Sequence, residues 1–195
     1  MGYIIVYLFM IPIKRKKNFE EIVEELRKFS FSYLEKYAPS KQQLKTYLLK
    51  KYLKTAIPNV KKSHINDLIT IVLEDLEKTK FLNDKFYSNS KAKILIQKGS
   101  SINKIRNYLM SKGVKDHYIK ETIDQIKDNN NDQDFFSAIK ICKKKRIGPA
   151  RDQDNRSLFY KKDISILARS GFDFETSKKI LDLEKVDFLR IVNLL

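Results

Sequence analysis

Tryptophan is absent from the sequence, and its 195 residues include only one cysteine, two histidines, five glycines and four prolines. Because Cys142 stands alone, an internal disulfide framework and a zinc-binding thiolate cluster are both excluded, and we expect a reducing, cytoplasmic setting. The two histidines, His64 and His117, lack a cysteine or carboxylate pattern at the spacing of a metal site. We therefore expect neither a metal nor a cofactor.

Sequence signatures of an active site are missing as well. The chain has no phosphate-binding loop of the GxxxxGK type. Four carboxylates lie near its beginning, namely Glu20, Glu21, Glu24 and Glu25. Their spacing is typical of a solvated helix face that pairs with Arg27 and Lys28, rather than of a general acid and base. An enzyme is therefore not expected.

Acidic residues are few relative to basic ones. The chain has 40 Lys and Arg residues against 24 Asp and Glu residues, which gives a formal net charge of +16 and an isoelectric point near 9.7. Such a surplus attracts polyanions, so nucleic acid or an acidic protein surface is the expected class of partner. A lysine-rich composition inherited from an AT-biased genome is the alternative, and the abundant Ile, Asn and Lys residues fit it.

The longest apolar run, residues 3 to 13 (YIIVYLFMIPI), is too short to span a membrane, which takes about 20 apolar residues. The basic run KRKK at residues 14 to 17 follows it, whereas a signal peptide carries its positive charge first. We predict a strand-like or loosely ordered arm and no membrane association. Alternatively, Met10 initiates translation and the preceding residues are an overextended start.

Apolar residues recur at helical intervals of three and four along most of the chain. Examples are Leu44, Tyr47, Leu48 and Tyr52, then Ile102, Ile105, Tyr108 and Leu109, and then Ile119, Ile123 and Ile126. Glycine and proline fall at joints between these segments, and Ser100 and Ser101 after Gly99 are suited as helix N-caps. The pattern predicts an all-α protein.

Two of the joints have similar sequences, LMSKGV at residues 109 to 114 and LARSGF at residues 167 to 172. Superposing Gly113 on Gly171 aligns Leu109 with Leu167. Leu48 takes the same place further upstream, with Tyr52 in place of the glycine. We therefore predict an elongated array of three tandem three-helix repeats, with an array of two-helix hairpins as the less fitting alternative. The predicted parts are an arm and lead-in helix (1–27), repeat 1 (28–79), repeat 2 (80–130), and repeat 3 with a C-terminal tail (131–195).

Residues 28 to 182 resemble the successive repeats of the RecX family of regulatory proteins. The most specific match is the family's motif L-D/N-D with an aromatic residue closely after it, here formed by Leu82, Asn83, Asp84 and Phe86. The ending L-x-R-x-G-F is matched by Leu167, Arg169, Gly171 and Phe172. The apolar arm, the missing first glycine and the long segment from residue 53 to residue 62 depart from the family pattern.

The resemblance implies a cytoplasmic, monomeric modulator of the RecA recombinase that acts in recombination, DNA repair and the SOS response. RecX proteins are curved helical proteins that lie in the groove of the RecA filament and limit strand exchange, ATP hydrolysis and filament growth. The alternative is a free-standing DNA-binding protein of helix-turn-helix type. The helix expected at residues 116 to 127 mixes acidic with basic residues, which disfavours insertion into a major groove.

Clusters of basic residues are the candidate binding site for the RecA filament or for single- or double-stranded DNA. They are Lys104, Arg106 and Lys112 in the middle repeat, the run Lys143, Lys144, Lys145 and Arg146, and Arg169. Arg151 and Arg156 follow that run closely. The alternative for each residue is favourable placement near a helix C-terminus. Four tyrosines, Tyr33, Tyr37, Tyr47 and Tyr108, could stack on bases, but their helical spacing favours core packing.

Overall fold

Ten α-helices and one short 3-10 helix make up the residues that the computed structural model describes, which are 18–54, 62–130 and 132–195. These ranges contain no strand, so the all-α prediction is confirmed. The helices are α1 (Phe19–Leu34), α2 (Lys41–Lys54), α3 (Lys62–Lys78), α4 (Asp84–Gln97), α5 (Ile102–Ser111), α6 (Asp116–Asn129), α7 (Gln133–Lys145), η1 (Gly148–Ala150), α8 (Gln153–Arg169), α9 (Phe174–Leu181) and α10 (Lys185–Leu194). The predicted apolar arm lies outside the described residues.

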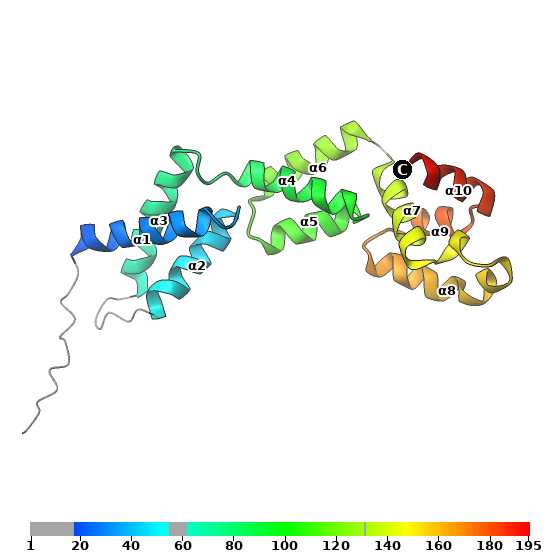
Figure 1. Cartoon of the computed structure of the whole chain (residues 1–195), viewed down its shortest axis with the longest axis horizontal. Coiled ribbons are helices and arrows are strands. Elements are labelled where there is room, and N and C mark those ends of the chain that lie inside the picture. The colour runs from blue at the N-terminus through cyan, green and yellow to red at the C-terminus, as the bar shows by residue number, and fades with distance from the viewer. Residues whose placement is uncertain (1–17, 55–61, 131) are drawn as a thin grey trace, which may run out of the picture.

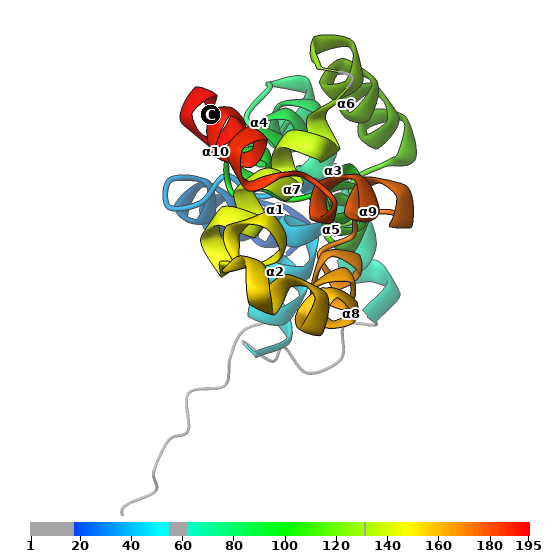
Figure 2. The ribbon, with the colours of Figure 1, turned by 90° about the vertical axis from the view of Figure 1, so that its right-hand side faces the viewer.

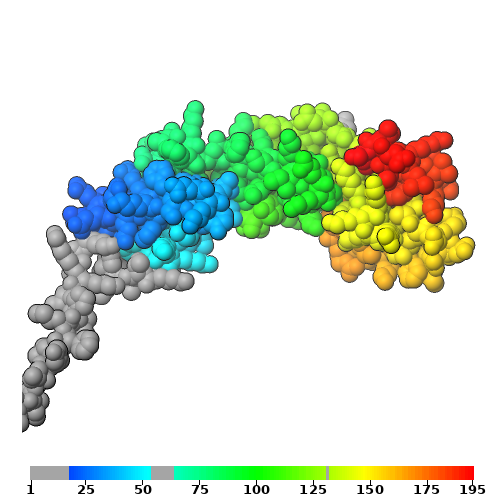
Figure 3. Space-filling view, in the orientation of Figure 1, coloured from blue at the N-terminus to red at the C-terminus, as the bar shows by residue number. Residues whose placement is uncertain are grey.

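Three separate hydrophobic cores divide the helices into groups. One core is built mainly from α1–α3, one from α4–α6, and one from α7–α10 with η1, and we call these groups the first, second and third units. The units follow one another along the long axis of the molecule (Figures 1 and 3), and Figure 2 views the row from its third-unit end. Leu48, Leu109 and Leu167, which the sequence aligns, are each completely buried in the core of their own unit.

The first unit begins earlier than the sequence suggests. The sequence divides a lead-in segment from the first repeat at residue 28, but both sides of that point lie in the continuous helix α1. Asn18 caps this helix by accepting a hydrogen bond from the Glu21 amide at 2.8 Å, and Glu21 accepts one from the Asn18 amide at 3.0 Å. Ile22 and Leu26, upstream of residue 28, are buried in the first core. The helix therefore starts at a capping box.

The C-terminal tail is a further helix. The sequence analysis assigns no helix to the tail of repeat 3, whereas α10 covers Lys185–Leu194 and packs against α7 and η1. Phe188 is only 2% exposed and belongs to the third core. Phe188, with the partly buried Ile191 and Val192 beside it, therefore fixes this helix to the unit. The short element was missed because a ten-residue pattern offers few periodic positions.

The units are joined by the same pair of hydrogen bonds at both joints. At the first joint, the Ser40 hydroxyl donates to the Lys112 carbonyl at 2.6 Å, and the Lys41 amide donates to the Asp84 carboxylate at 2.7 Å. At the second joint, the Ser101 hydroxyl donates to the Ser170 carbonyl at 3.0 Å, and the Ile102 amide donates to the Asp134 carboxylate at 2.7 Å. In each case the start of one unit's second helix is bound to the next unit.

Gly113 and Gly171 lie at these joints in the left-handed conformation, with φ of 69° and 90°. A Cβ atom at Gly113 would collide with the Gln42 side chain, and one at Gly171 would collide with the Ser101 hydroxyl. Each glycine therefore permits a close approach between units as well as the turn. Tyr52, the aligned residue of the first unit, faces no earlier unit among the described residues, which explains why a glycine is not needed there.

Candidate partner-binding surface

The α5 cluster of basic residues extends between the two joints. Lys104, near the beginning of α5, and Arg106 are exposed, whereas Lys112 at its end is half-buried with its Nζ 5.3 Å from the centre of the Tyr108 ring. Gly171, two residues after Arg169, lies against the backbone of Lys104. The structure therefore brings Lys104 and Arg169 to the second joint and places Lys112 at the first.

The run Lys143, Lys144, Lys145 and Arg146 lies at the C-terminal end of α7, and all four residues are exposed. Arg146 has a left-handed φ of 53°, a conformation that usually selects glycine. The backbone amide of Ile147 closes the helix by donating to the carbonyl of Cys142 at 3.1 Å. Four cations at this end interact favourably with the helix dipole. The backbone of Arg146 forms the C-cap, but none of the four side chains takes part in it.

Within the described ranges, the charged groups of eight basic residues form no ion pair and no hydrogen bond. They are Lys104, Arg106, Lys112, Lys143, Lys144, Lys145, Arg146 and Arg169. These cations are therefore available to an external anion. The α5 cluster lies in the second unit and the α7 run in the third.

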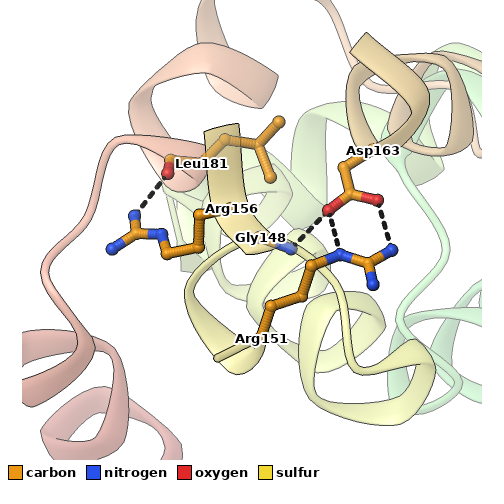
Figure 4. Close-up of polar contacts among 5 residues, drawn as sticks. All are labelled: Gly148, Arg151, Arg156, Asp163 and Leu181. Atoms are coloured by element: carbon orange, nitrogen blue, oxygen red, sulfur yellow. Dashed lines mark hydrogen bonds and ion pairs between the residues drawn. The ribbon is translucent and has the colours of Figure 1, made fainter. Parts of the chain in front are cut away.

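Arg151 and Arg156 have structural roles instead (Figure 4). The Arg151 guanidinium donates two hydrogen bonds, of 2.7 and 2.8 Å, to the carboxylate of Asp163, which also accepts the Gly148 amide at 2.8 Å. Arg156 donates to the carbonyls of Leu181 and Leu183, both at 2.7 Å. Both arginines therefore fix the third unit internally and do not belong to the free cations.

The buried carboxylate in this arrangement is ionised. Burial by itself would raise the pKa of Asp163, but the Arg151 guanidinium and the Gly148 amide outweigh it and hold the pKa below its usual value. Burial, with the nearby Asp163 carboxylate, raises the pKa of the Cys142 thiol to about 12. That thiol is therefore protonated and unreactive at neutral pH.

The tyrosines divide into packed and exposed residues. Tyr33 and Tyr47 stack with their ring centres 4.2 Å apart beside the first core, and Tyr108 packs against the second. Core packing is therefore confirmed for these three. For Tyr37 it is wrong, since this residue is 58% exposed.

Other pairings also differ from the sequence prediction. Glu24 pairs with Lys28 at 3.9 Å as expected, but Arg27 pairs with Asp75 of α3 at 3.1 Å. The helix α6 carries Lys120 and Asp124 on its exposed side, and Glu121 pairs with Lys85 of α4. This mixed surface remains unfavourable for a recognition helix in a DNA groove.

A feature that sequence reasoning missed is an apolar groove at the first joint, between the end of α1 and α4. Its volume is about 870 Å³, and aromatic side chains including Phe31, Phe81 and Phe86 line it. The signal was present in α4. Tyr87 and Ala92 occupy its buried face, whereas Phe86 and Ile94 stay exposed. A helix with large apolar residues on two faces has a second surface to cover.

The described residues contain no cluster of three or more His, Cys, Asp or Glu side chains that would hold a metal. Among them there is also no helix long and apolar enough to cross a membrane. The fold defines the class of this protein as an elongated all-α protein built from consecutive helical units. Unpaired cations lie on its surface.

Comparison with known proteins finds similar regulatory proteins. The chain is 29% identical over 160 residues to the regulatory protein RecX of Myxococcus xanthus (strain DK1622), which covers 80% of this chain and 84% of that protein. It is 30% identical over 127 residues to the regulatory protein RecX of Clostridium botulinum (strain Eklund 17B / Type B), covering 65% of this chain and 58% of that protein. No family model matches. The chain is thus similar over most of its length to proteins named regulatory protein RecX.

A solved structure supports the fold. The crystal structure of a regulatory protein RecX superposes with a TM-score of 0.63 over 85% of this chain and 74% of that one. At 17% identity this likeness is one of architecture. The resemblance seen in the sequence motifs is thus supported both by homologous sequences and by the arrangement of the helices.

Proposed function

We propose that this protein binds filaments of the RecA recombinase and inhibits their recombinase and ATPase activities. The observation that carries the proposal is the repeated joint, in which Ser40 and Ser101 bind the carbonyls of Lys112 and Ser170. Equivalent bonds fix successive units in one row and present similar surfaces at intervals. Such a row suits a partner that is itself a repeating filament.

Similarity to the RecX regulatory proteins supports the same partner, since that resemblance implies modulation of RecA. The protein acts in the cytoplasm as a monomer and by binding rather than by catalysis. A monomer that contacts neighbouring filament subunits inhibits by restricting the movements that accompany ATP hydrolysis and strand exchange. No bond is made or broken by the regulator in this mechanism.

The free cations provide the electrostatic part of binding. A RecA filament carries DNA at its axis, and an acidic protein surface or phosphate attracts exposed Lys and Arg side chains. The run Lys143–Arg146 and the α5 cluster are the two groups assigned to this role, together with Arg169 at the second joint. Because the groups lie in different units, they contact different places along the filament.

The first experiment measures binding to RecA filaments on single-stranded DNA, ATPase inhibition and inhibition of strand exchange, with the wild-type protein. A folded wild-type protein that neither binds nor inhibits would contradict the proposed function. The second compares a variant with Lys143, Lys144, Lys145 and Arg146 all replaced by Gln. Gln keeps helix propensity close to its original value, so the fold is expected to survive.

A matched control replaces four other exposed lysines with Gln, namely Lys93, Lys98, Lys120 and Lys127. Both variants lose four positive charges, so a difference in their filament affinity shows that the position of the charges matters. We expect the α7 variant alone to bind filaments more weakly. Exposed charges are screened over about 10 Å at 0.1 M salt, so wild-type binding should weaken as salt rises.

Bare single-stranded DNA separates the two kinds of contact. If the run reads phosphate, the slope of log affinity against log salt flattens by about 0.7 for each single-strand contact removed. If the variant binds both targets more weakly, the run contacts DNA. If it binds only filaments more weakly, the run contacts protein. Unchanged affinity and slope in a folded variant would remove Lys143–Arg146 from the site.

A further inference from the structure

The apolar groove at the first joint has a composition that differs from the rest of the surface. Its walls are the end of α1, the segment that leads to α2, the α3–α4 connection and the outer face of α4, which come together where the first unit meets the second (Figure 1). The lining residues are Phe31, Leu34, Glu35, Tyr37, Ala38, Pro39, Lys80, Phe81, Asn83, Phe86, Tyr87, Ser90, Lys91 and Ile94. Most of this lining is aromatic or aliphatic.

Large parts of these apolar side chains face solvent. Phe86 is 67% exposed, Phe81 is 62% exposed and Tyr37 is 58% exposed. The Phe31 and Phe81 rings meet edge to face, with their centres 5.3 Å apart, so the wall has a defined shape. A contiguous exposed apolar patch of this kind marks an interaction site. It buries its surface only when a partner is present.

The charges on the groove indicate the chemistry of that partner. Lys80 and Lys91 both line it, and neither forms an ion pair with a described residue, although Lys91 lies 5.6 Å from the centre of the Tyr87 ring. Glu35 is the one acidic residue in the lining. An apolar floor with free ammonium groups beside it is complementary to an apolar side chain flanked by carboxylates.

Lys80 has an unfavourable backbone conformation. Its φ is 62°, in the left-handed region, at the end of α3 where glycine is the usual residue. A side chain at such a position costs about 1 kcal/mol. Left-handed non-glycine residues concentrate at functional sites, and this one holds an ammonium group at the edge of the groove.

We propose that the groove binds an acidic segment of the filament protein and takes up one or two of its large apolar side chains. The inference rests on the proposed function, and it names the surface and the partner chemistry. A small molecule fits less well, because pockets for such ligands bury most of the ligand surface, whereas the walls here are open. An amphipathic helix or extended segment in an apolar groove matches this geometry.

The test compares filament binding by matched pairs of exposed-residue variants. Phe81→Ala with Phe86→Ala removes the two most exposed aromatic rings of the groove. Leu158→Ala with Phe174→Ala removes side chains in the third unit that are 75% and 67% exposed. Neither pair reaches a core, so both variants are expected to fold. We expect the groove pair to weaken filament binding at least tenfold and the control pair to leave it unchanged.

The variant Lys80→Gly separates the effect of the Lys80 charge on binding from any effect on protein stability. Glycine suits the left-handed position, so the variant should melt no lower than the wild type while binding filaments several-fold more weakly. A third measurement replaces Phe86 with the photo-crosslinking residue p-benzoylphenylalanine and identifies the peptide that is attached after irradiation of the filament complex. We expect an acidic segment of the recombinase.

The outcomes distinguish the inference from the function on which it rests. If the wild-type protein does not bind filaments, the proposed function fails and the inference fails with it. If the wild type binds but the groove pair binds equally well, only the inference is overturned. A crosslink to a second copy, to residues 3–13 of the same chain, or to a recombinase segment without carboxylates would also overturn it.

Discussion

The hydroxyl of Ser101, at the beginning of α5, donates a 3.0 Å hydrogen bond to the carbonyl of Ser170, at the end of α8. The two residues are 69 positions apart, and the bond crosses from the second unit to the third. Ser40 makes the same bond to Lys112 between the first and second units. A small N-capping side chain therefore joins neighbouring units in addition to its local role at the helix start.

Gly171→Ala should destabilise the third unit by about 2 kcal/mol, because the new Cβ meets both a left-handed backbone and the Ser101 hydroxyl. Urea unfolding followed by circular dichroism measures the loss. The double variant Ser101→Ala, Gly171→Ala removes the colliding oxygen, so it should lose less than the sum of the two single variants. If the losses of the two single variants simply add up in the double variant, the collision does not contribute to the destabilisation.

Asp134→Ala should weaken the coupling between the second and third units, since it removes the acceptor of the Ile102 amide. We expect the free energy of unfolding to fall by about 2 kcal/mol. The urea transition should also become broader, because units with a weakened interface unfold more independently. Asp132→Ala is the matched control. That residue lies at the same helix start, but its side chain makes no capping bond. Equal effects of the two variants would contradict the role assigned to Asp134.

Asp163→Asn should destabilise the third unit in a pH-dependent manner. Although burial raises the pKa of Asp163, its bonds to Arg151 and Gly148 hold that pKa below the usual value, so the carboxylate favours the folded state above about pH 4. Wild-type stability from this group is lost as the pH falls through the lowered pKa. The variant should be about 2 kcal/mol less stable at pH 7.

The measurement for Asp163 is a series of urea titrations between pH 7 and pH 3. The stability difference between wild type and Asp163→Asn should be constant in the upper part of this range. It should narrow below about pH 4, where the carboxylate protonates in the unfolded chain while it is still ionised in the folded protein. A difference that stays constant down to pH 3, or widens, would mean that ionised Asp163 does not stabilise the fold.

Phe188→Ala should release α10 from the third unit. The side chain is 2% exposed in the third core, and truncating a buried phenylalanine costs about 3–5 kcal/mol. Leu194→Ala, in the same helix, removes a side chain that is 87% exposed and should change the stability little. Hydrogen exchange of the α10 amides reports the release. Equal protection of α10 in the two variants would show that Phe188 is not its anchor.

Much of the helical architecture could be predicted without the structure. The spacing of Leu44, Leu48 and Tyr52 and of Ile119, Ile123 and Ile126 fixes which face of each helix is buried. Gly113 and Gly171 mark two helix ends. These features depend on residues within one or two turns of each other, so the local sequence contains the information. The short α10 and the true beginning of α1 were not recovered.

The candidate sites depend more on tertiary structure. The sequence places Lys143–Arg146 and Arg151 in one basic region, yet Asp163 neutralises Arg151 while the run stays free. It also gives no reason to join Phe31 with Phe81, whose rings meet across 50 positions of chain.

The sequence by itself therefore determined the helical class, the helix ends at Gly113 and Gly171, the excess of positive charge and the family resemblance. Only the tertiary structure decided which charges remain unpaired, how Ser101 reaches Ser170, and where exposed aromatic rings gather into a groove. The physical reason is range. Helix formation and turns follow from neighbouring residues, whereas ion pairing, burial and grooves depend on side chains that meet only after distant segments have packed.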